Sequence, residues 1–403
     1  MLRLRASTFN PEQQQNMFYE FIAPADTELL FGDEKFHPNQ IGTHIQVYNG
    51  EPTNLHEFNI AIIGIADGRG SLENEGCMTA PNEVRKQLYK LYLPSKHTFK
   101  AVDLGNVAPG ATARDTYFAL AAVVLKCVTH KVVPIIIGGS HDLTYGQFLG
   151  YQDLQGMINV VNVDERIDMG ASPDEPMSSS SFLMNMLMHQ PNYLFNYSHI
   201  GHQSYMNDPS AVDTLQSLNF DCYRLGLMQN NMEEVEPIVR DADMVSIDIS
   251  ALRMSDAPAH AQASPHGFYG EQLCQIARYA GMSDKVSSIG FYELNPHYDV
   301  NQQTAQLVAH AIWYFIEGYY NRKEDTPQED NNYYRFTVKL EEVDHEIIFW
   351  KSKRTERWWM EMPFRNTKFS REQHLIPCSY ADYQLACNEE LPDKWMKYYT
   401  KMI

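Results

Sequence analysis

The chain has 403 residues, and 44% of them are hydrophobic, which is typical of globular proteins and well above the share in disordered chains. Its 51 acidic residues outnumber its 32 basic residues and give a formal net charge of −19. This excess of acid argues against sequence-independent binding to nucleic acid or to an anionic membrane, because both attract basic surfaces.

Residues 1–57 mix polar residues with Pro and Gly and show no sustained period, so we expect an irregular N-terminal segment. The segment contains no apolar run of signal-peptide length. No stretch of the chain approaches the ~18 uninterrupted apolar residues of a membrane span. The cysteines lie far apart without a Cys-x-x-Cys pair, which indicates free thiols. A cytoplasmic protein is expected.

Residues 58–321 alternate between short, apolar, β-branched runs and helical segments. The predicted strands are 59–65, 132–139, 157–164 and 244–249, and the predicted helices are 80–88, 115–129 and 303–319. Repeated strand–loop–helix units predict an α/β fold in which helices cover a mainly parallel sheet.

Residues 322–332 are polar and of low complexity, which predicts a linker. Residues 333–403 then predict a small α+β unit, here called the C-terminal appendage, with a β-ribbon at 333–340 and 345–359 and helices within 380–402. Its Trp side chains are Trp350, Trp358, Trp359 and Trp395. We expect its aromatic residues to pack inward or against the main domain, and the alternative is a surface for a partner.

Three strand ends carry side chains suited to metal binding. His141 follows a Gly-Gly pair, Asp164 and Asp168 follow one strand, and Asp248 ends another. Ligand sites of parallel sheets lie beyond the carboxyl ends of the strands, so we expect these side chains to converge. Carboxylates with one imidazole suit a hard divalent cation such as Mn²⁺. Taken singly, each residue has a structural reading, as a hydrogen-bonded His or a capping Asp.

Several separated motifs occur in a recognisable order. They are Gly138-Gly139-Ser140-His141, Asp164-x-x-x-Asp168, Ser246-Ile247-Asp248 leading to Ala257-Pro258 and Gly267-Phe268, and Tyr292-Glu293-Leu294-Asn295-Pro296 followed by Thr304-Ala305. With them, the chain from about residue 58 to 320 resembles the ureohydrolase superfamily of arginases, agmatinases and formimidoylglutamases, and the last of these most. The resemblance implies a three-layer α/β/α fold, a dimanganese centre that hydrolyses C–N bonds of guanidino or formimino substrates, and a homo-oligomer.

The resemblance also implies which metal ligands are present and which are lost. The ligands of one family metal correspond to His141, Asp164, Asp168 and Asp248. The second metal needs a His and an Asp of its own, and those two lost ligand positions hold Arg166 and Ser250. An arginine stays protonated and cannot ligate, and a hydroxyl replaces a carboxylate poorly. We therefore expect one Mn²⁺ or none, and not two.

Charge counting suggests what replaces the second ion. Four aspartates and two divalent ions sum to zero in the family centre. Three aspartates, one ion and Arg166 also sum to zero here. We therefore hypothesise that the Arg166 guanidinium lies where the second ion would, between Asp164 and Asp248.

Glu293 corresponds to the residue that holds the cationic substrate group in the family, and a carboxylate is a natural partner for a planar cation. The resemblance thus makes Glu293 the candidate binding residue for a small guanidino or formimino ligand. Its alternatives are an internal partner for Arg166 or an ordinary strand-end Glu. The candidate catalytic residues are Asp168, Arg166 and Glu293.

Three functions remain open from the sequence. The first is a divergent formimidoylglutamase-like protein with at most one metal and weak or absent C–N hydrolase activity. The second is an active hydrolase of linear amidines that uses one metal together with Arg166. The third is a non-catalytic binding or scaffold protein, in which the C-terminal appendage carries the function.

Overall fold

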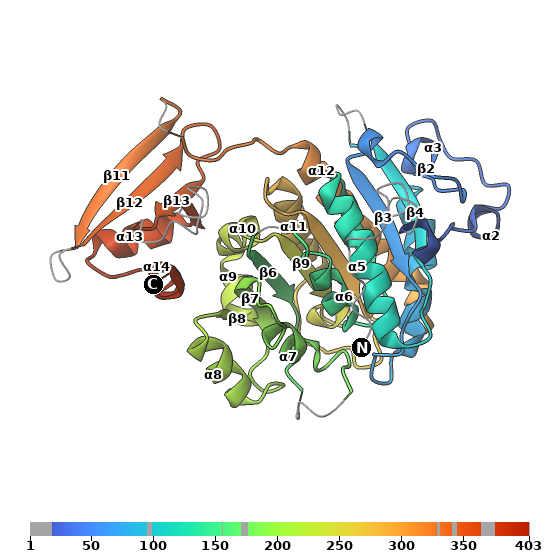
Figure 1. Cartoon of the computed structure of the whole chain (residues 1–403), viewed down its shortest axis with the longest axis horizontal. Helices are drawn as coiled ribbons and strands as arrows, with labels where there is room; N and C mark the ends of the chain where they lie inside the picture. The colour runs from blue at the N-terminus through green and yellow to red at the C-terminus, as the bar shows by residue number, and fades with distance from the viewer. Residues whose placement is uncertain are drawn as a thin grey trace.

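The computed structural model describes residues 18–94, 99–154, 156–170, 176–328, 331–340, 345–363 and 375–402. Within these ranges the chain forms a large α/β domain and, at the left of Figure 1, the C-terminal appendage. Residues 1–17 of the predicted N-terminal segment and residues 329–330 of the predicted linker lie outside the described residues.

The main domain is built on a 10-stranded sheet in the order β1-β4-β3-β5-β10-β9-β6-β7-β8, with β2 also paired to β4. Its strands are β1 (Ile22–Ala23), β2 (Gln46–Val47), β3 (Ile60–Ile65), β4 (Ala101–Val107), β5 (Val133–Ile137), β6 (Ile158–Val163), β7 (Leu194–His202), β8 (Asp221–Arg224), β9 (Met244–Asp248) and β10 (Ser288–Tyr292). Every pairing is parallel except that of β1 with β4. The predicted mainly parallel sheet is confirmed.

Helices cover both faces of this sheet (Figure 1). One face packs against α4 (Ala80–Leu88), α10 (Met232–Arg240), α11 (Gly270–Met282) and α12 (Gln303–Tyr320), and the other against α5 (Ala113–Thr129), α6 (Leu143–Leu149) and α7 (Phe182–Leu187). The other helical elements are η1 (Phe18–Phe21), α2 (Thr27–Phe31), α3 (Ile41–His44), η2 (Leu55–Glu57), η3 (Glu75–Thr79), α8 (Pro209–Ser217), α9 (Leu225–Asn230), η4 (Ile249–Ala251), η5 (Pro296–Tyr298) and η6 (Val300–Gln302).

The apolar strand sequences explain the three layers. Successive residues of a strand point to opposite faces, so a strand that is covered on both sides must be apolar throughout. In β3, Ile62 joins the core on the α4, α11 and α12 side, while Ile63 joins the core on the α5 and α6 side. All six residues of β3 are buried. The expected three-layer α/β/α architecture is therefore confirmed.

Residues 18–57 were expected to be irregular, and the structure gives them a place in the sheet. Strand β1 pairs antiparallel with β4, where Ile22 is opposite Val107. Strand β2 pairs parallel with β4, where Gln46 is opposite Val102. Each strand is only two residues long, which is too short to produce a periodic sequence signal.

The C-terminal appendage contains an antiparallel sheet in the order β11-β12-β13-β14. Its elements are β11 (Tyr333–Leu340), β12 (His345–Ser352), β13 (Trp358–Glu361), β14 (Leu375–Cys378), α13 (Tyr380–Cys387) and α14 (Asp393–Met402). All four of its Trp side chains are buried, with exposures of 4–8%. The Trp side chains therefore pack inward rather than forming an exposed Trp-rich face, whereas Tyr334 and Tyr380 are exposed.

The appendage is attached to the main domain by polar contacts. Lys397 of α14 donates to Asp221 at 2.8 Å, Arg357 pairs with Glu236 at 3.0 Å, and Arg240 donates to the Trp358 carbonyl at 3.1 Å. These contacts join α14 to β8 and the end of α10 to β13. Arg322, the first residue of the segment that was predicted to be a linker, donates to the carbonyls of Gly281 and Val286 in the main domain.

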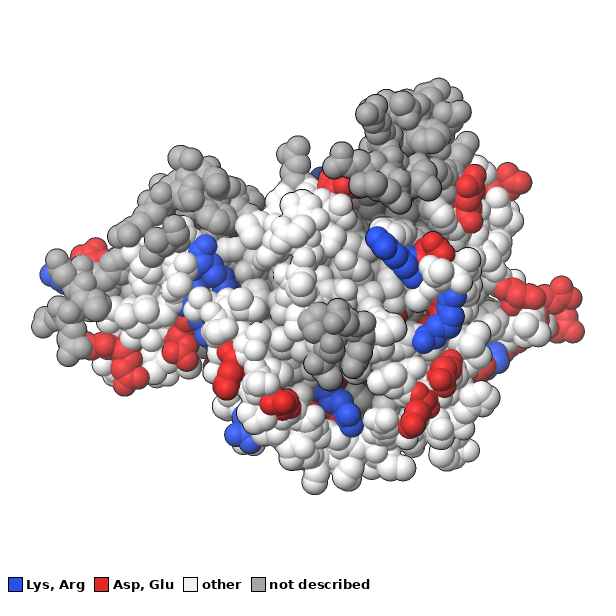
Figure 2. Space-filling model, turned by 60° about the horizontal axis from the view of Figure 1, so that its bottom comes forward, with Lys and Arg blue, Asp and Glu red and all other residues white. Residues whose placement is uncertain are grey.

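Acidic and basic side chains are interspersed on the face shown in Figure 2, where the basic groups stand singly rather than forming a patch. Among the described helices, none combines the length and the apolar character that crossing a membrane requires.

Candidate metal centre

His141 is positioned by the loop that follows β5. The loop passes close to the β3–α4 connection, and a Cβ on Gly139 would lie 1.7 Å from the Asp67 carbonyl oxygen. A Cβ on Gly138 would lie 2.2 Å from the Tyr292 ring. The Gly-Gly pair therefore permits a close approach that no other residue type allows. It delivers a fully buried imidazole to the carboxyl edge of the sheet.

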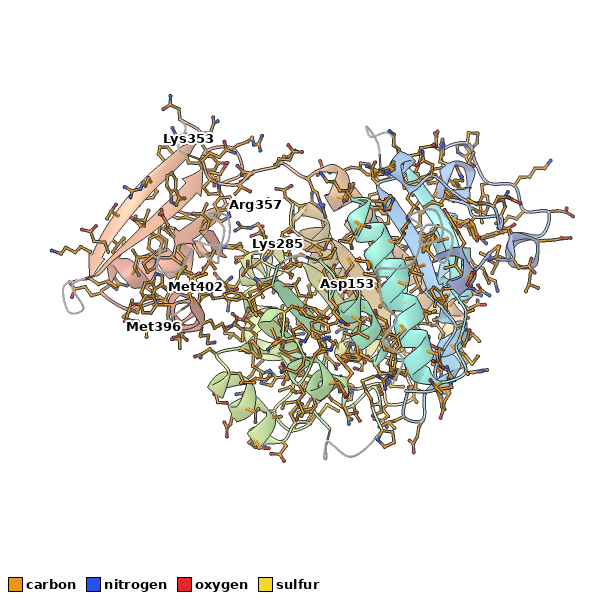
Figure 3. All side chains as sticks on the ribbon, viewed as in Figure 1. Asp153, Lys285, Lys353, Arg357, Met396 and Met402 are labelled. Atoms are coloured by element: carbon orange, nitrogen blue, oxygen red, sulfur yellow. The ribbon has the colours of Figure 1, made fainter. Side chains whose placement is uncertain are left out.

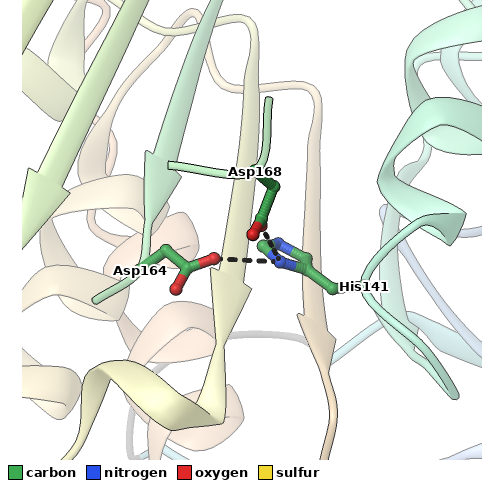
Figure 4. A group of neighbouring side chains, drawn as sticks. All are labelled: His141, Asp164 and Asp168. Carbon is green, nitrogen blue, oxygen red and sulfur yellow. Dashed lines mark ion pairs between the residues drawn. The ribbon is translucent and has the colours of Figure 1, made fainter. Parts of the chain in front are cut away.

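Three carboxylates converge on one nitrogen of this imidazole. The Nδ1 atom of His141 lies 3.1 Å from Asp164 Oδ2, 3.2 Å from Asp168 Oδ2 and 3.1 Å from Asp248 Oδ2. Figure 4 shows the carboxylates of Asp164 and Asp168 directed at the imidazole of His141, with both ion pairs drawn as dashed lines. These four residues are the ones that the sequence predicted to meet, and the structure brings them together.

The arrangement fits a divalent cation. His141 Nδ1 and Asp164 Oδ2 are buried and have no hydrogen-bond partner among the described residues, as expected of atoms that serve as ligands. Neighbouring ligands of an octahedral ion, held at roughly 2.1–2.3 Å from it, are about 3 Å apart. Burial lowers the pKa of His141, but the surrounding carboxylates of Asp248, Asp164 and Asp168 raise it well above its usual value. The cluster therefore attracts positive charge.

A second set of hydrogen bonds orients the imidazole. His141 Nε2 lies 3.0 Å from Ser246 Oγ, which in turn lies 2.6 Å from Thr144 Oγ1. With Nδ1 as the ligand atom, Nε2 carries the proton and donates it to Ser246. Ser246 comes from β9 and Thr144 from α6, so two elements of the main domain fix the ring.

The remaining oxygens of two aspartates are occupied by protein donors. Asp164 Oδ1 accepts from the Arg166 amide at 2.9 Å and from Ser250 Oγ at 3.3 Å. Asp248 Oδ1 accepts from the Ser250 amide at 2.6 Å. Ser250 thus contacts both aspartates at the position where the resemblance implied a second metal ligand. Its hydroxyl and amide donate to the Oδ1 atoms, whereas the Oδ2 atoms are the ones near His141.

The Arg166 side chain does not lie between the aspartates. It is 45% exposed, and its Nε contacts Glu165 Oε1 at 3.5 Å. The hypothesis that its guanidinium replaces a second ion between Asp164 and Asp248 is therefore not supported by the structure. The physical reason is that the Arg166 amide and Ser250 already donate hydrogen bonds to the Oδ1 atoms of the two aspartates. The long Arg166 side chain therefore keeps its charge in water.

Glu293 lies beside the cluster but is held by other residues. Its Oε2 accepts from Ser71 at 2.6 Å and from Asn74 at 2.7 Å, and its Oε1 accepts from the His141 amide at 2.9 Å. Burial raises the pKa of Glu293 to about 7, with the Asp248 charge adding and the three donors opposing. The carboxylate therefore ties the β3–α4 loop to the His141 loop.

Ser71, Asn74 and His260 were not among the residues predicted from the sequence. His260 Nε2 lies 4.0 Å from Glu293 Oε2, on the loop that follows β9. Burial lowers the pKa of His260, an effect that the charges of Asp248 and Asp164 oppose. All three residues lie in irregular loops, where the sequence has no period that fixes the direction of a side chain. The only available signal was their proximity to recognised motifs.

Comparison with known proteins identifies the family. The model of the arginase family matches residues 58–317, which is more than half of the chain. The chain belongs to the arginase family.

Its curated relatives in this family include formimidoylglutamases. The protein of Staphylococcus haemolyticus is 26% identical over 270 residues, which cover 64% of this chain and 85% of the relative. That of a Geobacillus strain is 26% identical over 267 residues, covering 62% and 80%. The arginase-family match ends before the appendage, which begins at residue 333.

Solved arginase-family structures share the fold. The formiminoglutamase of Trypanosoma cruzi, determined with Mn²⁺, aligns with a TM-score of 0.62 and 17% identity, covering 70% of this chain and 99% of that one. The formimidoylglutamase of Bacillus subtilis aligns with a TM-score of 0.64 and 18% identity, covering 72% and 96%. At this identity the likeness concerns the fold alone.

Proposed function

We propose that the protein is a divergent, formimidoylglutamase-like member of the arginase family that binds at most one Mn²⁺ and has weak or absent C–N hydrolase activity. The observation that carries the proposal is the engagement of Asp164 Oδ1 and Asp248 Oδ1 by Ser250 and the Arg166 amide. A bound ion would supply Lewis acidity to a water or a substrate. His141, Asp164, Asp168 and Asp248 would hold that ion.

The state of Glu293 supports weak activity. A small guanidino or formimino ligand carries a cation, and recognition of that cation by Glu293 requires free carboxylate lone pairs. Here three donors, from Ser71, Asn74 and the His141 amide, already use three of the about four acceptor sites of the carboxylate. One site on Oε1 is left, so a planar cation could not form two hydrogen bonds to Glu293 without displacing one of these donors.

An active one-metal hydrolase is the second candidate. Two observations favour it: the convergent set of one imidazole and three carboxylates is complete, and the curated relatives are named formimidoylglutamases. In this alternative Arg166 contacts substrate, which its exposure of 45% permits. The scaffold alternative receives less support, because the Trp side chains of the appendage are buried.

Metal stoichiometry tests the proposal. The purified protein is equilibrated with Mn²⁺, passed through a desalting column and measured by inductively coupled plasma mass spectrometry. We expect no more than one equivalent per chain, and no release of ammonia, urea or formamide from guanidino and formimino substrates above the background rate. Two equivalents would refute the proposal. One equivalent with clear turnover would favour the active hydrolase.

Restoring the two proposed metal ligands at positions 166 and 250 tests whether their loss limits the number of Mn²⁺ ions bound. The double variant Arg166→His/Ser250→Asp supplies an imidazole and a carboxylate at the two lost positions, and we expect it to bind one additional Mn²⁺. The control variant Arg114→His/Ser217→Asp adds the same groups at exposed positions of the main domain. No gain over the control would mean that loss of these two ligands is not what limits metal binding.

A further inference from the structure

A cavity of 380 Å³ lies at the carboxyl ends of β7 and β8. His202 and Arg224 are the last residues of these two strands, they are opposite one another in the sheet, and both line the cavity. The register of β7 shifts between Ile200 and His202, where Gly201 has a φ of 105°. Such a bulge re-aims the end of a strand. Ligands of α/β proteins bind beyond the carboxyl ends of the strands, and the volume is within the range of small-molecule sites, roughly 300–1,000 Å³.

The cavity is separate from the metal cluster, although both lie at the same edge of the sheet. None of the four metal-cluster residues lines it. Gln203, which does line it, is 4% exposed and donates from Nε2 to Glu165 Oε2 at 3.3 Å and from its amide to the Glu165 carbonyl at 3.0 Å. Glu165 is 1% exposed, is not a lining residue, and has its charge paired with Arg166 at 3.5 Å. A ligand in the cavity therefore need not contact the residues that would hold a metal.

Basic side chains line the cavity, and no Asp or Glu is among the described residues that line it. Arg224 is exposed and forms no hydrogen bond or ion pair with the described residues. Arg253 Nε donates to Asp256 Oδ1 at 2.9 Å, and Asp256 lies outside the lining. Burial lowers the pKa of His202, an effect that a backbone hydrogen bond opposes and the Arg224 charge reinforces. Because Asp256 compensates Arg253, the charge of Arg224 is the one that has no carboxylate partner.

Basic residues elsewhere in this acidic chain show the contrast. Figure 3 labels Lys285 of the main domain and Arg357 of the appendage. Lys285 pairs with Asp243 at 3.2 Å, and Arg357 pairs with Glu236 at 3.0 Å. Arg224 has no such partner, and salt at about 0.1 M screens exposed charges that lie more than roughly 10 Å away. Arg224 is therefore available to an anion from solution, despite the negative net charge of the whole chain.

Two exposed aromatic rings also line the cavity. Tyr205 is 70% exposed and Tyr269 is 44% exposed. The Arg253 guanidinium lies 4.1 Å from the centre of the Tyr269 ring, so this stacking and the Asp256 contact hold it in place. The Nη1 and Nη2 atoms of Arg253 form no hydrogen bond with the described residues. The wall thus combines planar apolar surfaces with oriented guanidinium donors, which suits a ligand that has both a ring and an anionic group.

We propose that this cavity binds an oxyanion carried on a planar aromatic ring, with the oxyanion paired to Arg224 and the ring packed on the exposed tyrosines. The oxyanion supplies the negative charge that Arg224 lacks, and its oxygens accept from the guanidinium donors of Arg224 and Arg253. An aromatic carboxylate and a nucleoside monophosphate both present this chemistry. The site is independent of the metal cluster and of any hydrolase activity.

Isothermal titration calorimetry on the full chain tests the proposal. The anionic probes are indole-3-acetate and adenosine 5′-monophosphate, and their neutral counterparts are indole-3-acetamide and adenosine, which keep the same rings. We expect at least one anion to bind at least tenfold more tightly than its neutral counterpart. The anion that binds more tightly would identify the ligand's oxyanion as a carboxylate or a phosphate. Binding of neither anion at 10 mM, or an advantage below tenfold for both, would overturn the proposal.

A matched pair of variants tests the location. Arg224→Gln should weaken binding of the anion at least tenfold. Arg114→Gln should leave it unchanged, because Arg114 is also an exposed arginine beside an aromatic ring, that of Phe118, but is outside the cavity wall. Equal effects of the two variants would contradict the assigned site. Hydrogen exchange of the unaltered protein provides a readout that does not depend on a variant's folding. The anion should slow exchange at 203–205 and 225–229, and unchanged exchange there would also contradict the site.

Discussion

Asp164 uses its two carboxylate oxygens for different tasks. Oδ2 faces His141 Nδ1 and has no hydrogen-bond donor among the described residues, whereas Oδ1 receives the Arg166 amide and the Ser250 hydroxyl. A carboxylate can therefore contribute one oxygen to a single ion while its other oxygen accepts hydrogen bonds from the protein. The proposed loss of two metal ligands is thus consistent with a local hydrogen-bond arrangement in which Ser250 and the Arg166 amide donate to the Oδ1 atoms of Asp164 and Asp248.

Glu293→Gln separates a structural role from a substrate-binding role. An amide can accept with only one of its two terminal atoms, so at least one donor among Ser71, Asn74 and the His141 amide loses its acceptor. We expect the free energy of unfolding to fall by about 1.5–3 kcal/mol, measured by urea denaturation. A substrate-binding role would instead raise KM without changing stability.

Glu389→Gln is the matched control for this prediction. Glu389 also has a φ of 65°, the same value as Glu293, but its side chain is exposed. Any effect of the amide on the left-handed backbone conformation should appear in both variants. Only the loss of buried hydrogen bonds is specific to Glu293. Equal destabilisation of the two variants would therefore contradict the structural role.

The convergence of His141, Asp164, Asp168 and Asp248 was predictable from the sequence because each of them ends or follows a strand. A parallel sheet brings strand ends to one edge, so recognising the strands before His141, Asp164 and Asp248 was enough to predict convergence. The direction of Arg166 was not predictable in this way. The direction of the Arg166 side chain depends on whether other donors already form hydrogen bonds to the aspartates. The loop geometry decides which backbone amides and hydroxyls can do so.

At the scale of elements, β4 shows why some strands escaped prediction. It contains Asp103, which is completely buried and receives two hydrogen bonds from Arg85 of α4, at 2.7 and 2.9 Å. Tyr89, which immediately follows the same helix, donates to Asp103 at 2.6 Å. A search for apolar runs rejects such a strand, because the partner that makes the carboxylate tolerable lies elsewhere in the sequence.

Arg85→Met should destabilise the protein strongly, because it leaves Asp103 charged and buried without its partner. We expect a loss of about 3–5 kcal/mol in the free energy of unfolding, measured by urea denaturation. Lys86→Met is the control on the same helix. Lys86 is 34% exposed and pairs with Glu83 at 2.7 Å, so its loss should cost less than about 1 kcal/mol. Similar losses for the two variants would argue against the buried pair as the link between α4 and β4.

At the scale of the whole molecule, buried ion pairs connect the appendage to the main domain. Asp221 of β8 is 2% exposed and accepts from Lys397 of α14 at 2.8 Å. Burial raises the pKa of Asp221, but Lys397 opposes this and the resulting pKa is below the usual value. The folded state therefore favours the ionised carboxylate, which links the appendage's attachment to pH.

A depressed pKa contributes stability at pH values above the unfolded value of about 3.9, and this contribution is lost as the pH falls through the folded value. Asp221→Asn removes the charge at every pH. We expect it to destabilise the protein by roughly 1–3 kcal/mol at pH 7, and by progressively less below pH 4, where the unaltered carboxyl also becomes protonated. Urea denaturation at pH 7 and below pH 4 measures this change in destabilisation.

Asp213→Asn, at an exposed position of α8, is the control. A difference between Asp221→Asn and the unaltered protein that persists undiminished in acid would mean that packing, rather than the Asp221–Lys397 pair, holds the appendage in place.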